Sequence, residues 1–254
     1  MRNLLLTLRY DGSKYHGWQI QPNGDTIEAN VKLALEKISG KNEKIIGCSR
    51  TDAGVHANMF CCNVKTECNV SVEKIPSAMN FYLPQDISVY HCEEVDENFH
   101  ARYDCKGKEY VYLIYNGKYR NPFYEGKAFF YPYKIDENLL NGEAKSFIGT
   151  YDFTSFCSAD TEIIDKVREI YDCCVKREND IIKIIVSGNG FLYNMVRIIV
   201  GTLLNINEGK IEKGTIKNII ESKNRERAGV TAPSSGLYLN KVFYEWGEVS
   251  GRKE

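Results

Sequence analysis

The 254-residue sequence has no apolar run long enough to cross a membrane. Its longest apolar stretch, residues 198–204, is far shorter than the roughly 20 residues that a membrane-spanning helix needs. The apolar start, residues 4–6, is broken by Thr7 and Arg9 and is too short for the core of a signal peptide. We therefore expect a cytoplasmic protein that does not contact a membrane.

The sequence also has no C-x-x-C pair among its nine cysteines. An odd count, with Cys61–Cys62 and Cys173–Cys174 adjacent in the chain, fits neither a disulfide framework nor a metal-binding motif. No cysteine lies in a motif that supplies a nearby histidine for thiol catalysis. We expect buried reduced thiols and no metal site.

No excess of either charge is present, since the formal net charge is −1. Total charge therefore does not indicate a nucleic-acid partner, although a local basic stripe would be enough to bind phosphates. A hydrophobic share of 43% with 26% charged residues is typical of a folded globular protein. The length allows one large domain or two smaller ones.

The hydrophobic pattern predicts two α+β halves, residues 1–105 and 106–254. In the first half it predicts strand, helix, strand, strand, helix and strand at 3–10, 27–38, 44–48, 59–64, 72–83 and 87–95. That order is typical of a split βαβ unit with an antiparallel sheet. Asp25 and Glu28 have the spacing of a capping box at the first helix.

The second half again alternates strands with helices. The pattern predicts a strand at 108–115, a helix at 136–148, a hairpin at 167–176 and 181–187, a buried helix at 191–206 and a last strand at 241–246. We therefore expect two ferredoxin-like halves with largely antiparallel sheets that meet at a central cleft.

The loop at residues 47–57, G-C-S-R-T-D-A-G-V-H-A, contains the first candidate functional residue. Asp52 lies there between Arg50 and Gly54. An aspartate in such a turn often only bonds its own backbone. The loop follows a β-branched run, however, and functional residues tend to lie on loops at strand ends. Asp52 is thus a candidate for catalysis, with a structural role as the alternative.

Two features of the second half also have both a structural and a functional interpretation. Tyr110 and Tyr112 share one face of a predicted strand, where they either pack in a core or offer a platform for a base. Arg197 lies in the predicted buried helix, and an unpaired buried arginine would cost several kcal/mol. No acid lies on its helix face, so its anion comes from elsewhere in the chain or from a ligand. A structural salt bridge is the alternative.

Taken together, these segments resemble the tRNA pseudouridine synthase A family. The loop at 47–57 resembles the signature loop of that family. Further segments fall in the family's order at 10–12, 17–19, 99–102, 108–112, 153–156, 190–197 and 232–239. The resemblance covers nearly the whole chain, and an ordered set of this kind is far more specific than one short motif.

The resemblance implies isomerisation of uridine to pseudouridine at positions 38, 39 and 40 in the anticodon stem-loop of tRNA. It implies that the enzyme needs no cofactor or metal and acts as a homodimer. Asp52 takes the place of the nucleophile, Tyr110 that of the tyrosine that stacks on uracil, and Arg197 that of the basic partner of the aspartate.

Three further residues receive substrate-binding roles from the same resemblance. Arg50 would fill the gap left by the extruded base, and Leu237 would line the base pocket. His56, in the signature loop, is also assigned to substrate binding. The family more often has Ala-Gly where this chain has Cys48 and Ser49, which leaves the reactive aspartate and its two flanking residues intact.

The chemistry fits these residues independently of the resemblance. Moving a base from a C–N to a C–C glycosidic bond needs a nucleophile, and a carboxylate can act covalently without a metal. Attack of Asp52 on C1′ of the ribose and attack on C6 of uracil both remain open. A cation such as Arg197 would keep the aspartate ionised in a dry pocket.

Two other functions compete with this interpretation. A retaining glycosidase needs a second carboxylate about 5 Å from the first, and the matched motifs offer none. A non-catalytic RNA-binding protein of the same fold would not need Asp52 and Arg197, and both residues are present.

Overall fold

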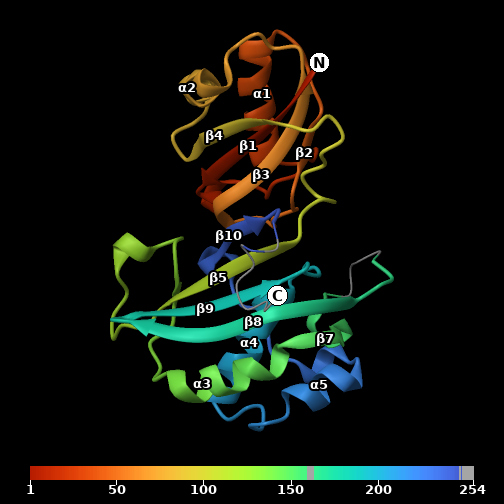
Figure 1. Ribbon diagram of the computed structural model, residues 1–254. Coiled ribbons are helices and arrows are strands. Elements are labelled where there is room, and N and C mark those ends of the chain that lie inside the picture. Colours follow the sequence, from red (N-terminus) through yellow and green to blue (C-terminus); the bar gives the residue numbers. More distant parts are fainter. Residues whose placement is uncertain (159–162, 246, 248–254) are drawn as a thin grey trace. The chain divides into compact units, whose positions relative to one another are not determined.

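The computed structural model describes residues 1–158, 163–245 and 247, and the chain divides into two compact units (Figure 1). Unit 1 comprises Met1–Lys106 and Tyr238–Tyr244, and unit 2 comprises Gly107–Leu237 with Glu245 and Gly247. The sequence-based division assigned everything after residue 105 to the second half. The segment Tyr238–Tyr244 belongs to unit 1 because it pairs there with the start of a long strand.

Unit 1 has the order of helices and strands that the apolar pattern predicts. Its elements are β1 (Arg2–Tyr10), α1 (Ile27–Ser39), β2 (Ile45–Gly47), β3 (His56–Thr66), a 3-10 turn (Val72–Lys74), α2 (Ile75–Tyr82) and β4 (Ile87–Val95), joined by β10 (Leu237–Phe243). The strand β1 is central and pairs antiparallel with β3 and β4. The far edge of β3 pairs antiparallel with β2 and, nearer its start, parallel with β10.

The N-cap of the first helix lies one residue later than expected, at Thr26 rather than Asp25. Thr26 is the N-cap, and its hydroxyl accepts a hydrogen bond from the backbone N–H three residues on (3.4 Å). Asp25 and Glu28 do not form the predicted capping box. Asp25 accepts from the Asn30 amide, and Glu28 accepts from the backbone N–H of Ile20. The capping-box prediction was therefore wrong, because the threonine between the two acids is the better placed cap.

Within unit 2 the strands follow the order β5-β9-β8-β7, and each neighbouring pair is antiparallel. Its strands and helices are β5 (Gly107–Tyr115), β6 (Phe129–Phe130), α3 (Glu137–Ala144), β7 (Gly149–Asp152), β8 (Val167–Glu178), β9 (Ile181–Gly188), α4 (Met195–Asn207) and α5 (Ile216–Ser222). The short β6 pairs parallel with β5. The fold class is thus mixed α+β with mostly antiparallel pairing.

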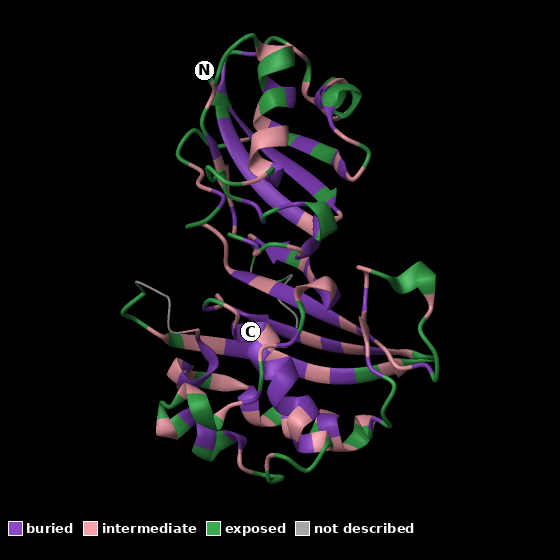
Figure 2. Cartoon of the chain, turned by 180° about the vertical axis from the view of Figure 1, so that it is seen from behind, coloured by how far each residue is buried: buried purple, intermediate pink, exposed green. Residues whose placement is uncertain are grey.

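The helices α3, α4 and α5 cover one face of the unit 2 sheet (Figure 1). The central helix is α4, in which ten of thirteen residues are buried, as expected for a helix that is apolar nearly all round (Figure 2). It begins at Met195 rather than at residue 191, because Asn194 has a left-handed backbone with φ of 59°. The last strand is Leu237–Phe243 rather than 241–246, and Trp246 lies outside the described residues.

Three predictions of absence concern the membrane, the cysteines and metals. Among the described residues, no helix is long and apolar enough to cross a membrane. The nine cysteines are all free thiols and seven are buried. Burial raises the pKa of the Cys62 thiol well above its ordinary value and that of Cys92 to about 11. The part of the chain that the structure describes contains no cluster of three or more potential metal ligands.

Candidate active site

Asp52 lies at the first position of a β-turn that leads directly into β3. The Val55 N–H donates to the Asp52 carbonyl (3.1 Å) and closes the turn. Gly54, at the third position, has φ of 75°, and a positive φ at this position is typical of a type II turn and favours glycine. The Asp52 residue is half-buried. The local sequence therefore displays a carboxylate on a rigid turn at the start of a strand.

The segment at residues 10–18 holds this loop on both sides of the aspartate. Before it, the Tyr10 hydroxyl bonds the Thr51 hydroxyl (2.8 Å), and the Trp18 N–H donates to the Thr51 carbonyl (3.0 Å). After it, the Gly54 N–H donates to the Tyr15 carbonyl (3.2 Å). Three hydrogen bonds from one segment thus fix the backbone that carries Asp52.

Two glycines let the segment approach the loop this closely. Gly17 has φ of 85°, and a Cβ at this position would lie 2.5 Å from the Thr51 carbonyl oxygen. A Cβ at Gly12 would lie 2.0 Å from the Val55 carbonyl oxygen. Any side chain at either glycine would push the loop away. This close contact explains the glycines of the matched segments at 10–12 and 17–19.

Asp86 also holds the segment at residues 10–18 in place. The sequence analysis did not identify this residue. Its carboxylate accepts from the Tyr15 hydroxyl, and its carbonyl accepts from the Asp11 N–H (2.9 Å). Burial and the neighbouring Asp86 carboxylate raise the pKa of Tyr15 above its ordinary value. Asp86 comes just before β4 in an ordinary turn sequence, so no local signal indicated a role at the loop.

We predict that the Tyr10–Thr51 hydrogen bond stabilises the loop cooperatively. Both residues are buried, so Tyr10→Phe and Thr51→Val should each lower the free energy of unfolding by about 1–3 kcal/mol. The double variant should cost less than the sum, because no buried hydroxyl then loses its partner. Urea unfolding of the four proteins measures this coupling. Strictly additive costs would show that the bond does not stabilise the loop.

His56, predicted to bind substrate, is only 1% exposed. Its Nδ1 lies 3.1 Å from the Gly12 N–H nitrogen and 3.1 Å from Asp11 Oδ1, and its ring stacks on Tyr238 (4.5 Å between centroids, 20° between planes). One ring nitrogen cannot accept and donate at once, so the tautomer selects one of the two partners. Burial, with a smaller contribution from Asp11, raises the pKa of Tyr238 to about 12.

The first residues of the loop differ in burial. Cys48 is buried, its N–H donates to the Cys61 carbonyl (2.8 Å), and its thiol accepts from the Cys61 N–H (3.4 Å). A cysteine at this position therefore ties the loop to β3. Arg50, two residues later, is exposed to solvent. Its guanidinium is available to a ligand, as the predicted role requires.

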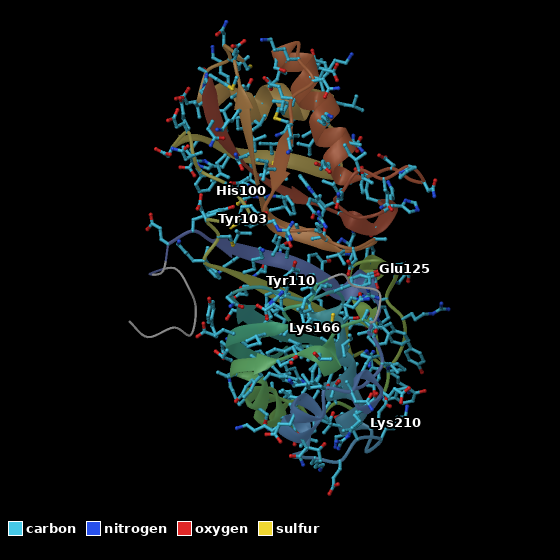
Figure 3. The ribbon with its side chains drawn as sticks, turned by 90° about the vertical axis from the view of Figure 1, so that its right-hand side faces the viewer. His100, Tyr103, Tyr110, Glu125, Lys166 and Lys210 are labelled. Carbon is cyan, nitrogen blue, oxygen red and sulfur yellow. The ribbon has the colours of Figure 1, made fainter. Side chains whose placement is uncertain are left out.

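Tyr110 and Tyr112 share one face of β5 in unit 2, because alternate residues of a strand point to the same side. Tyr110, labelled in Figure 3, is buried and meets Phe191 edge-on (5.1 Å, 82°). Tyr112 is fully buried and its hydroxyl donates to the Pro233 carbonyl (2.7 Å). Burial raises the pKa of Tyr112 above its ordinary value. The stacking role of Tyr110 stays a prediction.

Arg197, in the first turn of α4, is half-buried rather than buried as predicted. Its Nε donates to the Ala232 carbonyl (2.7 Å) and its Nη1 to the Asn194 side-chain oxygen (2.6 Å). In return, the Ala232 N–H donates to the Arg197 carbonyl (3.1 Å). These two acceptors are neutral groups, and they fix the direction of the guanidinium. The predicted pairing with Asp52 joins two units and stays a prediction.

The position of Ala232 depends on a close contact between α4 and the segment before it. A Cβ at Gly201 would lie 1.7 Å from the Val230 carbonyl oxygen. The Thr202 hydroxyl accepts from the Gly229 N–H (2.8 Å). These contacts lay the segment along the helix, which brings the Ala232 carbonyl to Arg197.

Leu237 follows the same segment at the start of β10. It is buried, and the preceding Gly236 packs so closely that a Cβ there would lie 2.8 Å from the Tyr112 ring. Ala232 and Gly236, both in the matched segment at 232–239, therefore contact the elements of unit 2 that carry Arg197 and Tyr112. These contacts with α4 and β5 could not be predicted from the motifs, because they depend on tertiary packing.

We predict that Gly201→Ala is strongly destabilising and that Gly142→Ala is not. The first variant forces α4 away from Val230, which should cost at least about 1–3 kcal/mol. Gly142 lies in α3 with nothing near its missing Cβ, so alanine there should stabilise by about 0.5–1 kcal/mol. Thermal unfolding of both variants compares them. Equal stability would contradict the close contact.

Comparison with known proteins places these features in one family. A family model described as tRNA pseudouridine synthase matches residues 7–104 and 144–245. A tRNA pseudouridine synthase A from Caldicellulosiruptor saccharolyticus is 47% identical over 244 residues, 96% of this chain and all of the relative. One from Bacillus pumilus is 45% identical over 241 residues, 94% of this chain and 98% of the relative.

A solved Cbf5-Nop10-Gar1 complex also matches, at 12% identity and a TM-score of 0.41 over 92% of this chain and 57% of that chain. This score is too low for an argument about the fold. The matches to the family model and to the two relatives, in contrast, extend over the Asp52 loop and the Arg197 helix alike. On that evidence, the chain belongs to the tRNA pseudouridine synthase family.

Proposed function

We propose that this protein isomerises uridine to pseudouridine in the anticodon stem-loop of tRNA, at positions 38, 39 and 40. The observation that carries the proposal is the Asp52 carboxylate on a β-turn that the segment at 10–18 fixes from both sides. The reaction exchanges an N1–C1′ bond for a C5–C1′ bond and moves a proton from C5 to N1. It gains and loses no atoms or electrons, so side chains alone can carry it.

In this proposal Asp52 is the nucleophile, attacking either C1′ of the ribose or C6 of uracil. Arg197 keeps the carboxylate ionised, because a nearby cation favours the charged form of an acid. Tyr110 stacks on the base, and its phenol can assist removal of the C5 proton. Arg50 occupies the gap that the extruded base leaves, which offsets part of the few kcal/mol of unstacking.

Leu237 and His56 receive different roles in this proposal. Leu237 is proposed to line the base pocket with an apolar side chain. His56 is proposed to brace the loop instead of contacting the substrate, since its buried ring is occupied by Gly12, Asp11 and Tyr238. The substrate-binding role that the resemblance gives His56 stays a prediction beside this proposal.

We also propose that both halves are ferredoxin-like and meet at a central cleft, and that the active form is a homodimer. The strand order β4-β1-β3-β2, with every neighbouring pair antiparallel, supports a ferredoxin-like first half. For the second half, for the cleft and for the dimer, the support is the resemblance in sequence.

The deciding experiment is chemical mapping of pseudouridine in an unmodified tRNA transcript incubated with the purified protein. We expect new pseudouridine within positions 38 to 40 and none elsewhere. A non-catalytic RNA-binding protein of the same fold would bind the transcript without converting it. Absence of conversion by a folded, tRNA-binding protein would overturn the proposed activity, and conversion elsewhere would overturn the proposed target.

A further inference from the structure

Unit 2 carries a surface segment whose composition differs from that of the rest of the chain. We call residues 118–134 the aromatic arm. It holds seven aromatic residues and four basic ones, Lys118, Arg120, Lys127 and Lys134, against a single acid, Glu125. The arm lies outside the two stretches that match the family model, and none of its residues belongs to the proposed catalytic site. On a chain with a net charge of −1, it is a local basic stripe.

Several rings of the arm face solvent instead of a core. Phe123 is 90% exposed, Tyr119 is 71% exposed and Tyr133 is 67% exposed. Figure 2 shows the short helix Pro122–Tyr124 as exposed, and Figure 3 labels the adjacent Glu125. Single exposed rings are common on protein surfaces. Three strongly exposed rings interleaved with cations in 17 residues are not explained by packing.

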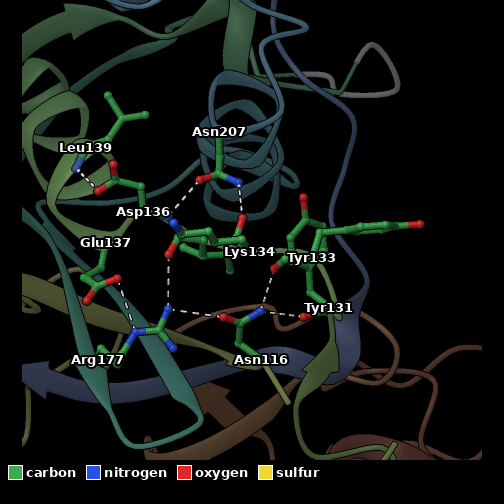
Figure 4. Close-up of polar contacts among 10 residues, drawn as sticks. Asn116, Tyr131, Tyr133, Lys134, Asp136, Glu137, Leu139, Arg177 and Asn207 are labelled. Atoms are coloured by element: carbon green, nitrogen blue, oxygen red, sulfur yellow. Dashed lines mark hydrogen bonds and ion pairs between the residues drawn. The ribbon is translucent and has the colours of Figure 1, made fainter. Parts of the chain in front are cut away.

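The base of the arm is held by a hydrogen-bonded frame (Figure 4). The Asn116 amide donates to the Tyr131 carbonyl (2.7 Å) and to the Tyr133 carbonyl (2.8 Å). The Asn207 amide donates to the Lys134 carbonyl (2.8 Å). Binding through the arm therefore does not have to order its base first, and that lowers the entropic cost of association.

The tip of the arm is also anchored. Tyr124 stacks on Tyr115 of β5 (4.9 Å, 23°), and the Asn121 side chain accepts from the Phe123 N–H (3.1 Å). Lys118 lies over the ring of Tyr119 (5.1 Å). Phe123 is thus presented on an anchored turn, and Tyr119 has a cation over its ring.

We propose that the aromatic arm is an auxiliary RNA-binding surface, where exposed rings stack on unpaired bases of the tRNA and the cations contact phosphates. This inference rests on the proposed function, because it takes tRNA as the substrate. Stacking on a ring and neutralisation of phosphates are the two interactions by which proteins hold single-stranded RNA. Among the acids near the base of the arm, Glu137 pairs with Arg177, Glu208 pairs with Lys210, and Asp136 accepts from the Leu139 N–H as the cap of α3.

A second copy of the chain is the rival occupant, and the charge of the arm disfavours it. A twofold interface places the same surface on both partners. Four cations against one anion on each side would then face each other, and like charges across an interface cost affinity. RNA, being anionic, is complementary to the same surface.

The test measures tRNA affinity for a Tyr119→Ala/Phe123→Ala variant of the full chain. Removing the ring under one stacked base should weaken binding about tenfold, and removing both rings should weaken it further. The matched control is Phe81→Ala/Tyr82→Ala, an exposed edge-on ring pair on α2 of unit 1. The control should bind tRNA with the affinity of the unchanged protein.

A second variant, Lys118→Gln/Arg120→Gln, tests the interaction with phosphates. The slope of log affinity against log salt should become shallower by about 0.7–0.9 for each phosphate that the variant no longer neutralises. If both arm variants keep the affinity and slope of the unchanged protein, the surface does not bind RNA.

Sedimentation of the same proteins tests the rival occupant. A changed oligomeric state with unchanged RNA affinity would assign the arm to a contact between copies and overturn the proposal. Pseudouridine mapping of the unchanged protein separates these results from failure of the proposed activity. Conversion by the unchanged protein with no effect of either arm variant would overturn the arm alone.

Discussion

Replacing Asp52 with alanine is expected to lower the rate of pseudouridine formation at least about 1,000-fold, or about 4 kcal/mol in activation free energy. The variant removes the carboxylate that the proposal makes the nucleophile, so the proposed covalent route is closed. Affinity for tRNA should change little, because phosphate and base contacts dominate binding and lie elsewhere. Single-turnover mapping of pseudouridine, with separately measured tRNA binding, gives both quantities.

Asp52→Asn is the matched control for this prediction. It keeps the size of the side chain and removes only the charge and the nucleophilic oxygen. The turn itself should survive in both variants, because it is closed by the Asp52 carbonyl and by Gly54 rather than by the carboxylate. Thermal unfolding checks this point. Unchanged turnover in either folded variant would exclude Asp52 as the nucleophile.

The supports of Asp52 show where sequence reasoning stops. A loop acid following a β-branched run could be identified because the signal is local. Asp86 and Tyr15 could not, because tertiary packing brings an ordinary turn before β4 against a segment about 70 residues earlier. Gly12 and Gly17 were noticed only as parts of motifs. These two positions need glycine because the loop backbone passes too close to allow a side chain. The sequence alone does not show which part of the chain comes this close.

The helices and strands also differ in how well the sequence predicts them, because some have bounds set by local patterns and others have bounds set by distant contacts. The strand at residues 87–95 was predicted with its observed bounds because alternation and turn signals agree there. The start of α4 was misplaced because Asn194 adopts a left-handed backbone that its residue type only permits. The last strand begins earlier than predicted because Tyr238 and Leu239 pair with β3. That pairing partner lies about 180 residues away, so no local pattern contained it.

The hydrogen-bond partners of Arg197 could not be predicted either, because no sequence pattern identifies them. One acceptor is the Ala232 carbonyl, a backbone group that any residue would provide. The sequence indicated correctly that the helix face near Arg197 holds Asn194 and no acid. It did not indicate that the guanidinium is half-buried with neutral acceptors. These two acceptors fix the direction of the guanidinium, and no sequence motif marks either of them.

We expect Arg197→Met to slow pseudouridine formation about 100-fold or more, and Arg50→Ala to slow it only about tenfold. In the proposal Arg197 acts on the reacting carboxylate, whereas Arg50 offsets part of the cost of base extrusion, which is a few kcal/mol in all. Arg197→Lys should recover little of the loss. A lysine keeps the charge but cannot reproduce two directed bonds to Ala232 and Asn194.

The pH dependence separates an electrostatic role of Arg197 from a structural one. A carboxylate that loses its cationic neighbour stays protonated over a wider range of pH. The rate of Arg197→Met should therefore recover as the pH is raised, while a variant that is merely misfolded would stay slow at every pH. Rates of both variants between about pH 5 and 8, with thermal unfolding as the check on folding, decide the matter. A larger loss for Arg50→Ala than for Arg197→Met would mean that Arg197 is not the partner of Asp52.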